Sequence, residues 1–185
     1  MKNEKKDAIV ITVIALAVFA VFLAADLITK AWAEQTQPHM YLFPGCGLTI
    51  IYNSGMAFSL FDDNKAAMIA IICFTVLLMI AIAILFFKLK PENRFLKIVL
   101  AIVEAGAIGN LVDRILWLSG SIEGVRDMID VSFSGFGVCN LADFYVSFGG
   151  VILVVYLIFF GKDPLIPLGK KRKEAQEESE EGLGE

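Results

Sequence analysis

Four aspartates stand close to amide and guanidinium side chains in the stretch from Gly106 to Val146. Both flanks of this stretch are apolar enough to cross a bilayer. Ionisable groups at membrane depth are costly, so their presence indicates a functional site. The acids are Asp113, Asp127, Asp130 and Asp143, and their polar neighbours are Asn110, Arg114 and Asn140.

A pair of these carboxyl groups could hydrolyse a peptide bond. Two close carboxyls cannot both ionise easily, so one keeps its proton and the other loses it. The ionised acid would activate a water molecule, and the protonated acid would donate to the carbonyl oxygen or the leaving amine. This is the chemistry of aspartic proteases and it uses no cofactor. His39 is the only histidine, so we expect neither a histidine-activated nucleophile nor a metal site.

Asp143 is the strongest candidate for one member of the pair. It begins an apolar helix and lies three residues after Asn140, so the two side chains share a helical face. Its partner could be Asp113, Asp127 or Asp130. Asp113 adjoins Arg114, and we expect these two to form a structural ion pair. The residues alone do not separate Asp127 from Asp130.

The elements that must position these acids are membrane-spanning helices. The chain is 57% hydrophobic, whereas soluble domains are about 45–50% apolar. The first apolar run could instead belong to a cleaved signal peptide, but it exceeds the ~7–15 residues usual for one, and more spans follow. Residues 1–165 are expected to form one membrane domain, and residues 166–185 a charged, disordered cytoplasmic tail. The expected spans are about 8–30, 66–87, 95–118 and 140–160.

Lysines and arginines predict the orientation of these spans. They are concentrated at both termini and in the loop at 88–97, whereas the two long loops at 33–64 and 119–139 carry only Arg126, with Lys65 directly after the first loop. The positive-inside rule therefore places both termini in the cytoplasm and both long loops outside. This topology brings nearly every unexplained polar group to the outer interface, with Glu104 about two helical turns deeper.

The first span and the first outer loop contribute further polar residues at that depth. Asp26 and Lys30 close the first helix on one face, either as an interfacial ion pair or as part of the site. The loop at 33–64 is an extended connection in which Leu48 to Tyr52 predicts a short strand. Asn53 and Gly55 follow in a segment that allows close backbone approach.

Five motifs in this order make the chain resemble the prokaryotic lipoprotein signal peptidases, also called signal peptidase II. The resemblance covers roughly Asp26 to Val146. It implies an all-α polytopic membrane protein with four transmembrane helices, a small extracytoplasmic β-cradle and a short periplasmic helix, the last two suiting residues 33–64. The motifs are D-L-I-T-K at 26–30, N-S-G-M-A-F at 53–58, G-N-L-V-D-R at 109–114, V-R-D-M-I at 125–129 and N-L-A-D at 140–143.

The resemblance also implies the activity. It indicates an aspartyl endopeptidase of the bacterial inner membrane that cuts diacylglyceryl-modified prolipoproteins before the lipidated cysteine. The partners implied are these substrates, membrane lipid and the inhibitor globomycin, with no nucleic acid, and a monomer is expected. By motif, Asp127 and Asp143 match the catalytic dyad. Positions matching the pocket are Asn53, Gly55, Asn110, Arg114 and Asn140, and those expected to support it are Asp26, Lys30 and Asp113.

Three residues depart from the family pattern. Cys139 replaces a common aromatic, Arg126 places a charge where an apolar residue is usual, and Glu104 is an unexpected acid in the third span. Arg126 could lower the pKa of a neighbouring carboxyl or face lipid headgroups. A small ion-coupled transporter is the alternative function, but it would need polar residues through the full membrane depth. A non-enzymatic assembly protein would not need two separate aspartates.

Overall fold

Residues 2–53 and 65–160 are described in the computed structural model of the 185-residue chain. The chain divides into two compact units, Met1–Gly149 and Gly150–Glu185. The expected tail at 166–185 lies outside the described residues. Within the described ranges, four helices are long and apolar enough to cross a membrane, as the sequence predicted. They are α1 (Lys2–Thr36), α2 (Lys65–Lys88), α3 (Arg94–Leu118) and α4 (Leu141–Phe159), the last of which runs across the boundary between the units.

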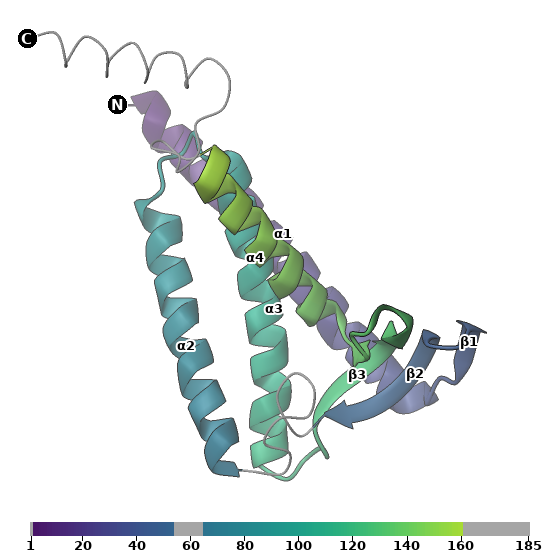
Figure 1. The fold of residues 1–185 in the computed structure, drawn as a ribbon. Helices are drawn as coiled ribbons and strands as arrows, with labels where there is room; N and C mark the ends of the chain where they lie inside the picture. Colours follow the sequence, from purple (N-terminus) through teal and green to yellow (C-terminus); the bar gives the residue numbers. More distant parts are fainter. Residues whose placement is uncertain (1, 54–64, 161–185) are drawn as a thin grey trace, which may run out of the picture. The chain divides into compact units, whose positions relative to one another are not determined.

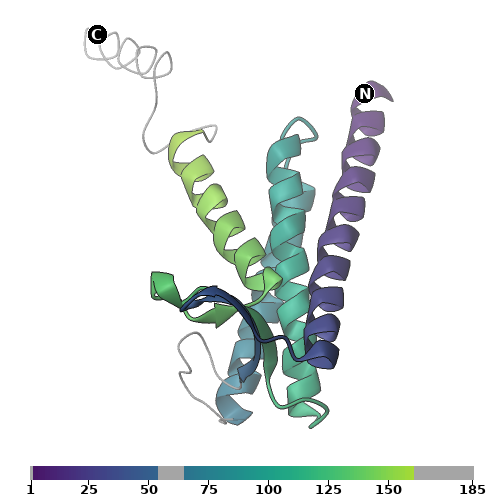
Figure 2. The same cartoon turned by 90° about the vertical axis from the view of Figure 1, so that its right-hand side faces the viewer.

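The central helix of the first unit is α3, which packs against α1 and α2. Helices α1 and α3 lie side by side in both views (Figure 1 and Figure 2). Burial explains how α3 tolerates its polar residues. In the most apolar 18-residue stretch of α3, 61% of the residues are buried, whereas none are buried in the corresponding stretch of α2. The polar groups of α3 therefore face protein, whereas α2 presents apolar side chains to lipid.

Two glycines of α3 let neighbouring helices approach closely, Gly106 the start of α4 and Gly109 the Asp26 side chain of α1. A Cβ atom on Gly106 would lie 2.7 Å from the carbonyl oxygen of Ala142, and one on Gly109 would collide with the carboxylate of Asp26. Small residues at such crossings allow helix backbones to meet. The first turn of α4 is thereby held against α1 and α3, at the depth where Asp26 lies.

A four-stranded antiparallel sheet connects the two long loops. Its order is β1-β2-β3-β4. The strand predicted at 48–52 is confirmed within β2, whereas the two strands of the second loop were not predicted. The sequence V-R-D-M-I-D of β3 lacks the period-two alternation of a strand with one wet face, because nearly all of its residues are buried. The strands are β1 (Met40–Phe43), β2 (Cys46–Asn53), β3 (Val125–Asp130) and β4 (Val138–Cys139).

The end of α1 differs from the prediction. Asp26 and Lys30 do not close the helix, which continues to Thr36 and so extends beyond the expected span. The extended connection begins only after that residue. The strands β1 and β2 lie between there and Asn53, where no helix is described. The rest of the loop to which the periplasmic helix was assigned, residues 54–64, lies outside the described residues, as does Gly55.

Candidate active site

Asn140 and Asp143 form a reciprocal cap at the start of α4. The backbone N–H of Asn140 donates to Asp143 Oδ2 at 3.0 Å, and the backbone N–H of Asp143 donates to Asn140 Oδ1 at 3.0 Å. The first N–H groups of a helix have no partner within it, and a carboxylate there is also favoured by the helix dipole. Asp26 satisfies one more of them by accepting from the backbone N–H of Ala142 at 3.0 Å. Local capping therefore fixes the Asp143 carboxylate.

Asp127 lies on β3 and is buried, with 2% of its surface exposed. Asn140 Nδ2 donates to its Oδ1 at 2.6 Å, and Asn53 Nδ2 donates to its Oδ2 at 3.2 Å. The pairing of β2 with β3 brings Asn53 within reach, because Ile51 stands opposite Asp127. The sheet thus joins two residues 74 positions apart in the chain.

Asp143 is held from the opposite side by α3 and α1. Asn110 Nδ2 donates to Asp143 Oδ1 at 2.8 Å, and Asn110 Oδ1 accepts from Lys30 Nζ at 2.9 Å. Lys30 is fully buried and pairs with Asp26 Oδ2 at 2.8 Å. A buried ammonium needs such partners, so Lys30 orients the amide that in turn orients Asp143.

Asn140 is the residue that contacts both acids. Its side-chain amide donates to Asp127, while its side-chain oxygen and backbone N–H engage Asp143. Burial and, to a smaller extent, the negative charge of Asp143 raise the pKa of Asp127 to about 7, although the amides of Asn53 and Asn140 oppose the shift. The geometry therefore holds two acids together with one proton available near neutral pH.

Asp113 and Asp130 are engaged elsewhere. The predicted pairing of Asp113 with Arg114 is wrong: Asp113 Oδ1 accepts from Arg126 Nη2 at 2.6 Å, and Asp113 Oδ2 from Arg126 Nε at 3.2 Å. Asp130 Oδ1 accepts from the hydroxyl of Ser132 at 2.6 Å and from its backbone N–H at 2.9 Å, which holds the pKa of Asp130 below its usual range. Of the three partners that the sequence left open for Asp143, Asp127 is the one that shares Asn140 with it.

Arg126 neither faces headgroups nor lowers the pKa of Asp127. Only 7% of its surface is exposed, and successive side chains of a strand point to opposite faces. Its Nη1 donates to Glu34 Oε2 at 2.7 Å, so the guanidinium ties β3 to α1 as well as to Asp113 on α3. Sequence reasoning missed Glu34, although it lies four residues after Lys30 on the same helical face.

Comparisons with known proteins agree with this geometry. The sequence model of "Signal peptidase (SPase) II" matches residues 18–159. The chain belongs to the signal peptidase II family. A lipoprotein signal peptidase of Pelagibacter ubique is 35% identical over 152 residues, covering 80% of this chain and 87% of that protein. One of Clostridium novyi is 30% identical over 154 residues, covering 80% and 97%.

Solved structures support the fold of this signal peptidase II family member. A bacterial membrane enzyme solved by the in meso method at 1.9 Å resolution superposes with a TM-score of 0.66 at 23% identity, covering 78% of this chain and 92% of that one. The mostly helical fold with a small antiparallel sheet is confirmed, and so is the family resemblance. The chain is a protease, and nothing supports the transporter alternative.

Arg114 and Cys139 are two further polar residues near the acids. Arg114 is near enough to Asp143, Asp127 and Asp113 to interact with their charges, and its Nε has no hydrogen-bond partner within the described ranges. Burial raises the pKa of the Cys139 thiol to about 12, with the nearby carboxylates adding to the effect. Cys139 therefore remains a neutral thiol that donates to the carbonyl of Ile129, and it is not a nucleophile.

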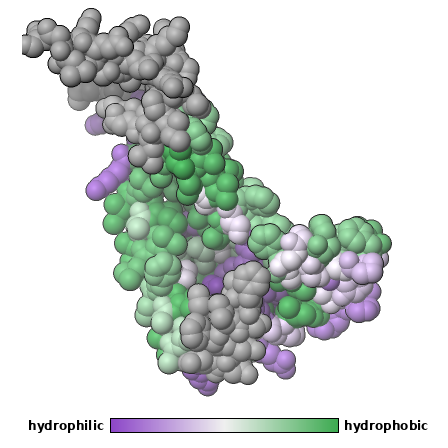
Figure 3. Space-filling view, viewed as in Figure 1, coloured by the Kyte–Doolittle hydropathy of each residue, from purple (hydrophilic) through white to green (hydrophobic). Residues whose placement is uncertain are grey.

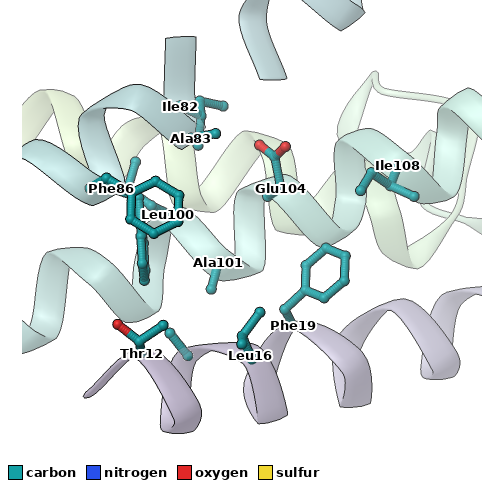
Figure 4. Close-up of a pocket in the computed structure, with 12 residues that line it drawn as sticks. Thr12, Leu16, Phe19, Ile82, Ala83, Phe86, Leu100, Ala101, Glu104 and Ile108 are labelled. Carbon is teal, nitrogen blue, oxygen red and sulfur yellow. The ribbon is translucent and has the colours of Figure 1, made fainter. Parts of the chain in front are cut away.

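Glu104 does not belong to the acid cluster. It lines a cavity of about 300 Å³ between α1, α2 and α3, together with apolar side chains such as Phe19, Phe86 and Leu100 (Figure 4). Nine residues separate it from Asp113 along α3, or about 13 Å by helical rise. This cavity is therefore distinct from the candidate active site.

Proposed function

We propose that Asp127 and Asp143 form the catalytic dyad of an endopeptidase that removes signal peptides from diacylglyceryl-modified prolipoproteins. The cut falls immediately before the lipidated cysteine. One observation carries this assignment: Asn140 engages both carboxyl groups, donating to that of Asp127 by its side-chain amide and to that of Asp143 by its backbone N–H. Membership of the signal peptidase II family supports the substrate class.

The two acids take complementary roles. Asp127, with a pKa of about 7, carries the proton, whereas Asp143 acts as the base and is positioned by Asn110 and the start of α4. Asp143 removes a proton from a water molecule as the water oxygen attacks the scissile carbonyl carbon. Asp127 protonates the carbonyl oxygen in the same step. The tetrahedral intermediate then collapses: the proton held by Asp143 moves to the leaving amine, and Asp127 takes a proton back from a hydroxyl of the intermediate as the new carboxyl group forms, which restores both acids.

Five residues bind the substrate in this proposal. Asn53, Asn110 and Asn140 present amides around the dyad, and a side-chain amide can both donate to and accept from a peptide group. Arg114 supplies a positive charge for the oxyanion that develops at the scissile carbonyl. Gly55 is carried by the family motif alone, because it lies outside the described residues.

Three residues support these groups. Lys30 orients Asn110, Asp26 holds both Lys30 and the first turn of α4, and Asp113 holds β3 through Arg126. Buried charges of this kind require complete pairing, and a satisfied network keeps a site rigid. They are positioning residues in this scheme.

The dyad lies on the extracytoplasmic side of the bacterial inner membrane, with both termini in the cytoplasm. The distribution of lysines and arginines supports this orientation, and the four apolar helices support a multi-span protein. We propose a monomer that is surrounded by membrane lipid and inhibited by globomycin.

The test is cleavage by the full-length protein reconstituted in lipid. A prolipoprotein carrying diacylglycerol on its cysteine should be cut before that residue, as read by mass spectrometry, and the same protein without the lipid should remain intact. Equal cleavage of both forms, or a cut at another bond, would contradict the proposed specificity.

A further inference from the structure

The outer edge of the sheet exposes large apolar side chains. Leu42 on β1 is 86% exposed, and Phe136, in the turn between β3 and β4, is 76% exposed. Three neighbours in these two segments are also exposed. We call the set the apolar shelf; its members are Met40, Leu42, Phe43, Phe133 and Phe136.

The segments that carry the shelf contain no charge. Residues 37–53 and 131–140 include no Asp, Glu, Lys or Arg. Edge strands that face water are usually protected by charged residues or proline, since their unpaired backbone groups invite aggregation. Strand β1 is such an edge, with the sequence M-Y-L-F, so its exposed side suits an apolar environment better than water.

The shelf is preorganised from two distant parts of the chain. The rings of Phe43 and Phe133 meet edge to face with centroids 5.5 Å apart. The backbone N–H of Phe133 donates to the carbonyl of Gly45 at 3.1 Å. Gly45 has φ +79°, and a Cβ atom there would lie 2.7 Å from the Phe133 nitrogen, so only glycine fits this turn.

The sheet lies where membrane-spanning helices enter the bilayer. Strand β4 ends at Cys139, two residues before α4 begins at Leu141. Figure 1 shows the sheet beside the end of α1 and the start of α4, extending away from α2. In Figure 3 this part of the molecule, to the right of the helices, is mainly green along its upper edge and mostly purple along its lower right edge. The upper edge lies on the side towards which the body of α1 runs, so we take it as the side nearer the hydrocarbon core.

We propose that the apolar shelf inserts into the lipid leaflet around the start of α4. Acyl chains are the occupant that matches an uncharged, aromatic surface at that depth, since interfacial elements bury their apolar face about 5–10 Å below the headgroups. Through β2 and β3, this contact holds Asn53 and Asp127 at a constant depth in the membrane.

Fluorescence quenching by lipids brominated on their acyl chains tests the insertion without depending on catalysis. Trp32→Phe and Trp117→Phe together remove the native tryptophans, and Leu42→Trp or Phe136→Trp then reports from the shelf. Ser121→Trp is the control, because Ser121 is exposed in the loop after α3 and outside the shelf.

Both shelf tryptophans should be quenched about twofold or more relative to the control, because they lie within the acyl region. Quenching equal to that of Ser121→Trp, together with strong quenching by aqueous acrylamide, would overturn the proposal. A second outcome would also overturn the proposal: protection of the shelf tryptophans from acrylamide that increases with the protein-to-lipid ratio, without quenching by brominated lipid. A second copy of the chain would then cover the shelf.

A charged substitution provides a second measurement. In the Leu42→Trp protein, Phe136→Asp should lower quenching by brominated lipid, whereas Phe136→Leu should leave it unchanged, because a carboxylate resists transfer into hydrocarbon. Equal quenching in both variants would contradict insertion of the shelf as one surface.

Discussion

Asn140 Nδ2 lies 2.6 Å from Asp127 Oδ1, while the side-chain oxygen of the same Asn140 accepts the backbone N–H of Asp143. A single side-chain amide thereby links two acidic residues on different elements, a strand and a helix. Asn140 is fully buried, so neither bond competes with bulk water. Its two functions, capping α4 and holding Asp127, can be separated by substitution.

Asn140→Ser should retain the cap of α4 but lose the bond to Asp127, because a serine hydroxyl caps helices well but is too short to bridge to the strand. We expect kcat to fall by about 10–100-fold, or about 1.4–2.7 kcal/mol, with a small change in melting temperature. Asn140→Ala, which loses both functions, should additionally destabilise the fold by about 1 kcal/mol. Equal kcat in Asn140→Ser and the parent would show that the amide does not position Asp127.

Arg126 should matter for stability more than its surface-loop position in the sequence implies. Arg126→Met leaves the buried carboxylate of Asp113 without its bidentate partner, which should cost about 3–5 kcal/mol of unfolding free energy. Glu34→Gln removes only the partly exposed arm of the network and should cost about 1 kcal/mol or less. Thermal unfolding in one lipid or detergent condition compares them.

The control for Arg126 neutralises the acid that it pairs with. Asp113→Asn added to Arg126→Met should recover part of the lost stability, since the only carboxylate that then lacks the guanidinium is the partly exposed Glu34. A double variant that is less stable than Arg126→Met alone would contradict the pairing described.

The elements that the sequence predicted well are those governed by local composition. Uninterrupted apolar runs identified all four spans, and the spacing of Asn140 and Asp143 placed both on one helical face. The strand β3 was missed because its charges are buried against protein, which reverses the pattern expected of a surface strand. The partners of Asp113 and Arg126 were missed for a related reason: sequence adjacency suggested Arg114, whereas the sheet brings Arg126 onto the acid.

The family motifs, and not the spacing of the residues, predicted Asp127 as the partner of Asp143. The residues alone left Asp113, Asp127 and Asp130 open as the partner of Asp143, because a strand register determines which of them reaches Asn140. The contact of Glu34 with Arg126 was missed because it depends on the continuation of α1 to Thr36, beyond the membrane span that hydropathy defines. Long-range pairing, rather than local pattern, therefore determines this site.

The raised pKa of Asp127 should appear in the pH dependence of stability. Because the folded protein binds this proton more tightly than the unfolded chain does, the contribution of Asp127 is most favourable below pH about 4. It is lost as the pH rises towards 7, and it is constant above that value. The melting temperature of Asp127→Asn, measured relative to that of the parent, should therefore increase as the pH rises from about 4 to about 7. A difference that does not change over this range would contradict the shift.

Cleavage by Asp127→Asn and Asp143→Asn tests the dyad most directly. Each variant, reconstituted in lipid with a diacylglyceryl prolipoprotein, should unfold cooperatively at a melting temperature no lower than the parent's and lose about 10³-fold or more in kcat, since general acid and base catalysis contributes on that scale. Asp130→Asn is the matched control and should keep kcat near the parent value, because Asp130 bonds only to Ser132 among the described side chains. Parent-like kcat in either Asp127→Asn or Asp143→Asn, in a folded protein, would contradict the account.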